Sequence, residues 1–381
     1  MRAFAQGRIL AILPLLLGLL VAPVVMVGGA PVSAQDATPA PLSCTPLAVS
    51  AEVPLAATPA TESAAAPTGE LKKVKMGYVP VSIFAPVFVA KEKGYFAEQG
   101  LDVSLEPFPG GSDPVVLTAS GQLDLGIGGA GPAFWNAIAQ GLPIKVIAPG
   151  HAEGSPVATP LMISKEACES GATTSVADLK GKKVSVNARG ATEYWLSQAL
   201  ATGGLTLDDI DLQTLAFPDA VAALASGAVD AAMVGEPLAT KAEQDGIAVR
   251  LLSDFPVQNI QPTVVFANEN FLKENPDAAT GLVTAYLKAS RDLTGEGYNA
   301  PENLAIVEQY TKVPAALVAA SVKPVYAING EINLDGLATM QDFFRQRGLL
   351  EYDQDLDPAQ IVDTQYVDAA LATLGPYQPG S

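Results

Sequence analysis

The chain has 381 residues, of which 49% are hydrophobic and 16% charged, so it is long enough for two domains and too apolar to be disordered. Its 40 acidic and 22 basic residues give a formal net charge of −18. This charge repels phosphate and anionic lipid, which argues against nucleic-acid binding and against membrane docking through a basic patch. With two cysteines and one histidine, no multi-ligand metal site and no other cofactor is expected.

The N-terminal 34 residues have the composition of an export signal. Arg2 and Arg8 precede an uncharged apolar run from about residue 9 to residue 27, and the small residues 32–34 fit a cleavage site. The run is also long enough to span a bilayer, so residues 1–34 are predicted to be a signal peptide or a membrane anchor. In either case, the rest of the chain is expected in the periplasm or at the extracellular face of the membrane.

Residues 35–70 are predicted to form a linker, because most of them are Ala, Pro, Thr or Ser and offer little surface to bury. Such a linker could tether a folded body to a membrane. Cys44 follows Pro41-Leu42-Ser43, which has proline where a lipoprotein signal has leucine, so lipid attachment at Cys44 is a minor alternative. A disulfide between Cys44 and Cys168 also stays open.

From Leu71 onward, short apolar strands alternate with helical segments, as in parallel α/β sheets. Strands are predicted at 74–78, 101–106, 123–127 and 144–148, and helices at 85–99, 112–120 and 132–140. Residues 256–381 are predicted to be mostly helical, with one helix starting at Pro276 and another covering about 334–347. Residues 264–266 are predicted to be a strand that returns to the first sheet.

The same order of motifs recurs about 104–110 residues later, which predicts two similar lobes. The hexapeptide 119–124 (ASGQLD) matches 225–230 (ASGAVD), and Gly100, Gly129 and Gly141 match Gly204, Gly235 and Gly246. Lobe one is predicted to comprise residues 71–155 and 256–381, and lobe two residues 156–255. The crossovers near 149–156 and 255–262 would form a hinge. The expected fold class is α/β, with two parallel-sheet lobes and a helical C-terminal region.

Open parallel sheets bind ligands at the carboxyl ends of their strands, where helices begin with unpaired N–H groups. The candidate ligand-binding residues in the corresponding loops are Ser82, Phe84, Gly111, Ser112, Asp113, Gly129, Ala130, Arg189, Ala191, Thr192, Asp219 and Glu236. The Arg189 guanidinium could clamp an oxyanion. Asp113, Asp219 and Glu236 could instead hold an amine. Because Glu236 precedes a proline at an expected helix start, its carboxylate can serve the helix dipole, which favours the oxyanion.

Two other site interpretations are weaker. Residues 126–131 satisfy the G-x-G-x-x-G fingerprint of nucleotide binding, but they follow the third strand, and the matching segment of the repeat lacks the glycines. Catalysis has little support, because His151 is the only histidine and no nucleophile–base set surrounds it in the sequence. His151 is expected to be packed or solvated near the first crossover, and Trp135, Tyr194 and Trp195 are expected in the core.

Taken together, these motifs resemble the solute-binding proteins of ABC importers in the nitrate, sulfonate and taurine (SsuA-like) group, which includes binders of thiamine pyrimidine precursors. The resembling stretches are 85–90, 94–103, 119–124, 141–146, 178–184 and 235–237, and the resemblance covers about 73–374. It implies a type II Venus-flytrap fold in a monomer that closes on a small molecule and delivers it to a membrane permease and its ATPase. The chain departs from the family at Gly235, where members often carry an aromatic residue. It also lacks the cysteine-rich motif of the family's pyrimidine synthases.

The sequence therefore predicts an extracytoplasmic, non-enzymatic binding protein of an ABC importer, with a small anionic solute of the sulfonate, nitrate or taurine class as its ligand. A thiamine pyrimidine precursor or another amine-bearing heterocycle is the alternative ligand. An α/β enzyme and a sensor or scaffold domain without a transporter are the alternative functions.

Overall fold

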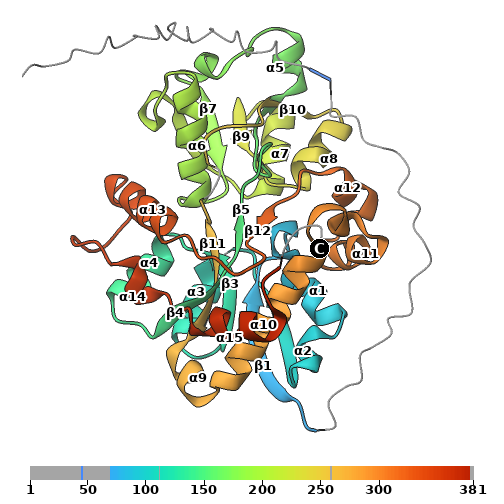
Figure 1. Ribbon diagram of the computed structural model, residues 1–381. Coiled ribbons are helices and arrows are strands. Elements are labelled where there is room, and N and C mark those ends of the chain that lie inside the picture. The colour runs from blue at the N-terminus through green and yellow to red at the C-terminus, as the bar shows by residue number, and fades with distance from the viewer. Residues whose placement is uncertain (1–43, 46–68, 111, 258–259, 378–381) are drawn as a thin grey trace, which may run out of the picture. The chain divides into compact units, whose positions relative to one another are not determined.

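The computed structural model describes residues 44–45, 69–110, 112–257 and 260–377 (Figure 1). The predictions for residues 1–34 and for most of the linker therefore lie outside the described residues. Within the described ranges, no helix has the length and apolar character needed to cross a membrane.

The first sheet has five strands in the order β2-β1-β3-β11-β4. Their bounds are Lys72–Tyr78 (β1), Leu101–Pro107 (β2), Leu125–Gly129 (β3), Ile144–Pro149 (β4) and Thr263–Asn268 (β11). Strand β1 pairs in parallel with β2 and β3, whereas β11 runs antiparallel to β3 and β4. The predicted return of residues 264–266 to this sheet is confirmed.

The second sheet repeats this plan in the order β8-β7-β9-β6-β10. Its strands are Leu161–Ser164 (β6), Lys183–Val186 (β7), Asp211–Thr214 (β8), Ala231–Met233 (β9) and Ala248–Leu252 (β10). The first three strands in this order are parallel, and β6 is antiparallel to both of its neighbours. The predicted α/β fold is confirmed, although each sheet is mixed and not wholly parallel.

The repeated hexapeptide has the same structural role in both sheets. A carboxylate oxygen of Asp124 accepts the Lys75 N–H at 2.8 Å, and one of Asp230 accepts the Lys183 N–H at 2.9 Å. Each aspartate thus ties the start of one strand to its neighbour. The motif is a strand-pairing device, and its recurrence reflects the repeated sheet plan.

The helices cover the sheets and form the C-terminal region. Up to β10 they are η1 (Ser82–Phe84), α1 (Ala85–Glu92), α2 (Tyr95–Glu98), α3 (Ser112–Ala119), α4 (Pro132–Ala139), α5 (Lys165–Glu169), η2 (Val176–Leu179), α6 (Ala191–Thr202), η3 (Leu207–Asp209), α7 (Phe217–Ser226) and α8 (Leu238–Gln244). The later ones are α9 (Glu269–Glu274), α10 (Pro276–Asp292), η4 (Gly295–Asn299), α11 (Pro301–Thr311), α12 (Ala315–Ala320), α13 (Leu334–Gln346), α14 (Pro358–Ile361) and α15 (Gln365–Leu374). The predicted single helix at 85–99 is wrong, because Gly94 adopts φ +75° and breaks it into α1 and α2.

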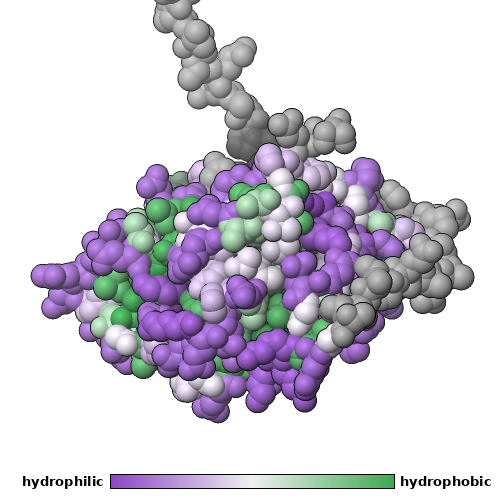
Figure 2. Space-filling model, turned by 60° about the horizontal axis from the view of Figure 1, so that its bottom comes forward, coloured by the Kyte–Doolittle hydropathy of each residue, from purple (hydrophilic) through white to green (hydrophobic). Residues whose placement is uncertain are grey.

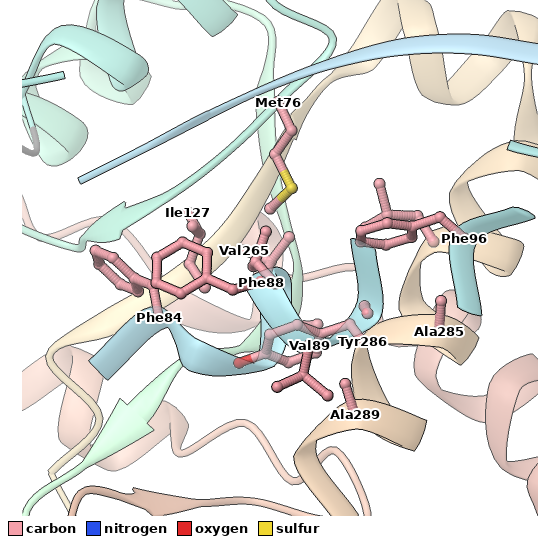
Figure 3. Close-up of a cluster of buried hydrophobic side chains, with 14 of the residues drawn as sticks. Met76, Phe84, Phe88, Val89, Phe96, Ile127, Val265, Ala285, Tyr286 and Ala289 are labelled. Carbon is pink, nitrogen blue, oxygen red and sulfur yellow. The ribbon is translucent and has the colours of Figure 1, made fainter. Parts of the chain in front are cut away.

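The core of the first sheet is built from the sheet, α1 and α10. Phe88 and Tyr286 are at most 2% exposed and lie between these layers, with Met76 and Val265 reaching in from the sheet (Figure 3). A second cluster combines side chains from both sheets with α6 and α13, and a third lies around α7 and α8. On the face shown in Figure 2, hydrophilic residues predominate and hydrophobic areas are small and separate.

Two crossovers connect the sheets, one from β4 to β6 and one from β10 to β11. Strand β5 (His151–Ala152) in the first crossover pairs antiparallel with β12 (Val325–Tyr326). The His151 backbone N–H donates to the Thr263 hydroxyl at 2.9 Å, which binds the start of the first crossover to the end of the second. Gly150 permits this approach, because a Cβ there would lie 2.2 Å from Thr263 Oγ1.

A disulfide joins Cys44 to Cys168 in α5, with a Cα–Cα distance of 5.8 Å. The pairing that the sequence left open is therefore present. Lipid attachment at Cys44, the minor alternative, is wrong because the sulfur atom that it requires is already bonded. The bond attaches the segment that ends at Cys44 to the part of the chain that carries the second sheet.

Candidate functional site

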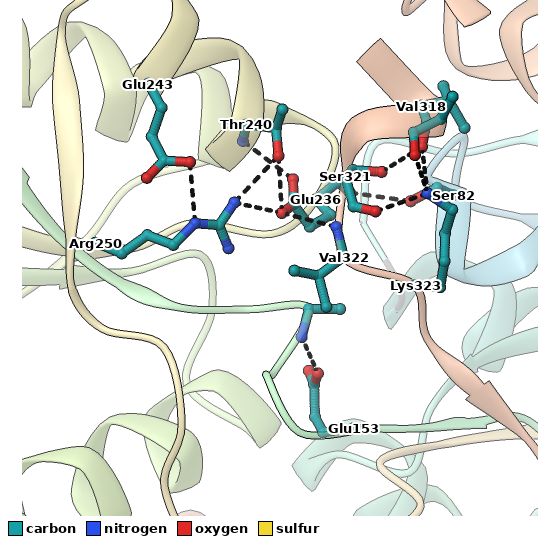
Figure 4. Close-up of polar contacts among 12 residues, drawn as sticks. Ser82, Glu153, Glu236, Thr240, Glu243, Arg250, Val318, Ser321, Val322 and Lys323 are labelled. Atoms are coloured by element: carbon teal, nitrogen blue, oxygen red, sulfur yellow. Dashed lines mark hydrogen bonds and ion pairs between the residues drawn. The ribbon is translucent and has the colours of Figure 1, made fainter. Parts of the chain in front are cut away.

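Loops from the two sheets meet at Ser82 and Glu236. Ser82 follows β1 and Glu236 follows β9, and the Ser82 hydroxyl donates to the Glu236 carbonyl oxygen at 3.1 Å (Figure 4). Ser82 is 2% exposed and Glu236 is 4% exposed. The structure thus brings together two candidate residues that are 154 positions apart.

The C-terminal region fixes the Ser82 side of this contact. The Ser82 carbonyl oxygen accepts the Tyr298 hydroxyl at 3.1 Å and the Tyr326 hydroxyl at 3.3 Å. Beside them, the Lys323 ammonium donates to three carbonyl oxygens at the end of α12, and burial lowers the pKa of Lys323 to about 8. Ser82 is therefore held in place by groups more than 200 residues further along the chain.

The Glu236 carboxylate is surrounded by four donors (Figure 4). The Thr240 N–H and hydroxyl donate at 3.0 Å, the Arg250 Nη2 at 2.6 Å and the Val322 N–H at 3.3 Å. Arg250 Nε also donates to Glu243 at 3.0 Å, and burial raises the pKa of Glu243 although Arg250 opposes this effect. The Glu236 carboxylate therefore caps α8 and neutralises Arg250, which leaves it poorly placed to hold an amine.

The starts of two helices also approach each other. Helix α4 begins after Gly131 and helix α6 after Gly190, and neither N-cap glycine has a side chain to bind the free N–H groups. A Cβ at Gly190 would lie 3.6 Å from Pro132 Cδ, so the start of α4, which follows a strand of the first sheet, lies beside the start of α6, which follows a strand of the second. Two helix dipoles thus present their positive ends to the same region.

Arg189 lies directly before the start of α6, but its guanidinium already forms an ion pair. Its guanidinium forms an ion pair with Glu193 one helical turn ahead, with Nη2 donating at 3.0 Å, while its side chain stays 42% exposed. Glu193 is fully buried and also accepts Arg347 Nε at 2.9 Å. The exposed part of Arg189 is therefore held at the start of α6 by a carboxylate that Arg347, the residue after α13, also contacts.

The other candidate residues are more scattered. Phe84 is 3% exposed and packs in the core of the first sheet, beside Phe88 and Ile127 (Figure 3), a placement that does not favour ligand contact. Ala130 is buried and accepts the Trp135 Nε1–H, and the Thr192 hydroxyl donates to Asn187 at 2.5 Å. Gly129 and Ala191 are half-buried, Ser112, Asp113 and Asp219 are exposed, and Gly111 lies outside the described residues.

The expected core aromatic residues are confirmed: Trp135 is 0% exposed, Trp195 2% and Tyr194 9%. Trp195 also donates its Nε1–H at 2.9 Å to Glu153, a buried carboxylate in the first crossover. His151 is packed, with Nδ1 2.7 Å from Thr263 Oγ1, and burial lowers its pKa to about 3.

Arg250 and Phe217 were not among the candidate residues, although Phe217 belongs to the same expected loop as Asp219. Arg250 gave no local signal, because its two carboxylate partners come from another element. Phe217 could have been noticed, because it starts α7 directly before Pro218 and two residues before the candidate Asp219. Two surface hollows, one of about 500 Å³ between α6 and α13 and one beside α10, are lined by none of the candidate residues.

The sequence profile of the family described as NMT1/THI5-like matches residues 82–299, more than half of the chain. The chain belongs to this family. It is 28% identical to the nitrate/nitrite-binding protein NrtA of Nostoc over 244 residues, a match that spans 59% of this chain but only 55% of that protein. It is 27% identical to a binding protein of Brucella abortus, with 78% of this chain and 92% of that protein covered.

Solved structures share the fold. The periplasmic nitrate-binding protein NrtA of Synechocystis matches with a TM-score of 0.68 and 19% identity, over 80% of this chain and 90% of that protein. The desulfurization enzyme DszB matches with a TM-score of 0.58 and 16% identity, over 80% and 99%. The family resemblance and the periplasmic-binding-protein fold that the sequence predicted are therefore confirmed.

Proposed function

We propose that this member of the NMT1/THI5-like family is the extracytoplasmic substrate-binding protein of an ABC importer, and that it captures a small solute carrying an oxyanion group. The relatives support this proposal, because those that match over 244 to 312 residues are named as binding proteins, among them binders of nitrate or nitrite and of bicarbonate.

The neighbouring starts of α4 and α6 carry the oxyanion part of the proposal. Each helix start contributes roughly half a positive charge, and neither N-cap glycine brings a side chain that would compete with a ligand for the first turn. Glu193 occupies the Nε/Nη2 edge of the Arg189 guanidinium, and the opposite edge, made by Nη1 and Nη2, adds planar donors for an oxyanion. The amine alternative has less support, because the Glu236 carboxylate already accepts four hydrogen bonds.

We assign residues 71–155 and 256–381 to one lobe and residues 156–255 to the other, with the two crossovers as the hinge between them. A solute that touches both helix starts binds the closed arrangement more tightly, and this difference in affinity drives closure. Small-angle scattering should then give a smaller radius of gyration at saturating ligand. An unchanged radius would contradict hinge closure.

The same proposal covers location, partners and activity. The protein would act as a monomer outside the cytoplasmic membrane, exported by its N-terminal segment, and would deliver its ligand to a permease and an ATPase. An enzyme is the second candidate, because the desulfurization enzyme DszB shares the fold. Ligand recovered chemically unchanged after prolonged incubation would favour the binding protein, and turnover would favour the enzyme.

Two experiments test the ligand class. Mass spectrometry of small molecules released from the purified protein identifies what it carries. Calorimetry with nitrate, bicarbonate and methanesulfonate should then show that Arg189→Ala loses about 2–4 kcal/mol of binding, the scale for breaking a desolvated charge contact. Arg189→Lys should lose part of this binding free energy. Lys182→Ala, which removes a surface cation paired with Asp230, should lose no binding free energy. Tight binding of an amine that Arg189→Ala leaves unchanged would refute the oxyanion assignment.

A further inference from the structure

Phe217 is a half-buried aromatic residue that no hydrophobic core accounts for. It opens α7, whose residues Ala220 and Leu224 are buried in the third hydrophobic cluster, and Leu215 and Val221 pack against that cluster. The Phe217 ring belongs to none of the three clusters that the described residues form. The position of this ring is therefore not set by packing in a hydrophobic core.

The ring lies directly on Gly235. A Cβ at Gly235 would be 2.8 Å from Phe217 Cε2 and 3.1 Å from Cζ, closer than side chains approach one another. Glycine at this position is therefore what gives the ring its room. The next residue, Glu236, receives the hydrogen bond from Ser82, so the ring lies beside the contact between loops of the two sheets.

The sheet register places this ring on the same edge as Arg189. Strand β7 pairs in parallel with β8 on one side and β9 on the other, and the Leu215 N–H donates to the Val186 carbonyl oxygen at 3.0 Å where β7 and β8 end. The loops that carry Arg189, Phe217 and Gly235 thus leave the carboxyl edge of three adjacent strands. This is the edge at which α/β sheets bind their ligands.

We propose that Phe217 is a specificity-determining residue whose ring, seated on Gly235, forms an apolar wall of the solute site. The proposal rests on the proposed function and deepens it. The helix starts and Arg189 would hold an oxyanion, and the ring would pack against an organic body attached to it, a contact that a bare inorganic ion cannot make. The site therefore favours organic oxyanions, such as alkanesulfonates, over inorganic ones.

Calorimetry with 1-butanesulfonate and with nitrate tests this selectivity. The wild-type protein should bind butanesulfonate more tightly than nitrate. Phe217→Ala should weaken butanesulfonate binding at least tenfold and change nitrate binding less than twofold. Gly235→Ala should act in the same direction, because the added methyl group displaces the ring, and the double variant should lose no more than Phe217→Ala alone. Phe343→Ala, which removes a ring on α13 that contacts Tyr194, should leave the ratio of the two affinities unchanged.

Two results would overturn the assignment: a wild-type preference for nitrate, or an equal effect of Phe217→Ala on both probes. If the wild-type protein binds neither probe, the oxyanion assignment fails. The role of Phe217 can then still be tested by placing 4-fluorophenylalanine at position 217 and adding fractions of a small-molecule extract of the host. An extract fraction that raises the Tm and shifts the fluorine resonance supports the wall. A fraction that raises the Tm without shifting the fluorine resonance refutes the role of Phe217 as a wall. If none of the fractions raises the Tm, both the binding function and the wall are refuted.

Discussion

Replacing Arg250 by methionine removes the cation that holds two buried carboxylates. The side chains of Arg250, Glu236 and Glu243 are 6%, 0% and 4% exposed, so water cannot replace the lost donors easily. Methionine keeps most of the length and apolar contact of the arginine stem. Breaking a buried ion pair from one side costs about 3–5 kcal/mol. This loss is a large share of the 5–15 kcal/mol by which domains are typically stable.

Urea unfolding of the full chain at pH 7 measures this loss. The matched control is Lys241→Met, because Lys241 on α8 pairs with Asp245, the residue after the helix, and both side chains are 45% exposed. Exposed pairs with this i,i+4 spacing contribute about 0.3–0.5 kcal/mol. The Arg250→Met loss should shrink at pH 5. A buried glutamate such as Glu243 has a folded-state pKa above its ordinary value of 4.5, so the folded state binds the extra proton and regains stability as the pH falls.

Two outcomes would refute the inference that Arg250 stabilises the fold by pairing with Glu236 and Glu243. One is an Arg250→Met loss no larger than that of the Lys241 control. The other is a loss that stays the same between pH 7 and pH 5, because burial raises the pKa of Glu243 and the lost Arg250 cation no longer opposes this rise.

Three further perturbations have definite expected outcomes. Cys168→Ser should lower the free energy of unfolding by about 4–5 kcal/mol, because the disulfide spans 124 residues, and wild-type protein in reductant should match it in urea titrations. Trp195→Phe removes the donor to Glu153 and should cost about 1–3 kcal/mol; a Tm equal to that of the wild type would refute the role of this bond. His151→Asn should make unfolding less acid-sensitive: the pKa of His151 falls from 6.5 to about 3 on folding, so its contribution is complete above pH 6.5 and is lost toward pH 3. Parallel Tm curves of variant and wild type from pH 7 to pH 4 would contradict this.

Features that repeat along the chain could be predicted from the sequence. The hexapeptide that ends in Asp124 and recurs at Asp230 disclosed the duplicated sheet plan, because the same hydrogen bond between neighbouring strands recurs in both sheets. Trp135 and Trp195 were correctly expected in the core. The break at Gly94 was missed because the apolar pattern continues on both sides of it.

Contacts between side chains of different elements could not be predicted, even where the elements are consecutive, because they depend on how finished elements pack. Arg250 reaches Glu236 and Glu243 only after β10 and α8 have docked. The pairing of Arg189 with Glu193 lies within one helical turn, yet the burial of Glu193 depends on the arrival of Arg347 beyond the end of α13. The Phe217 ring over Gly235 likewise requires two loops whose closeness follows from strand order.

The disulfide between Cys44 and Cys168 changes what a cut in the linker would do. The chain before Cys44 is bonded to α5, while β1, the first strand, belongs to the other sheet. A protease that cleaves once between residues 46 and 68 would therefore produce two polypeptides that still migrate as one molecule until a reductant is added. Where the N-terminal segment holds the protein at a membrane, mechanical load would pass through α5 and not through β1, and a cut between residues 46 and 68 would release the body only once the disulfide is also reduced.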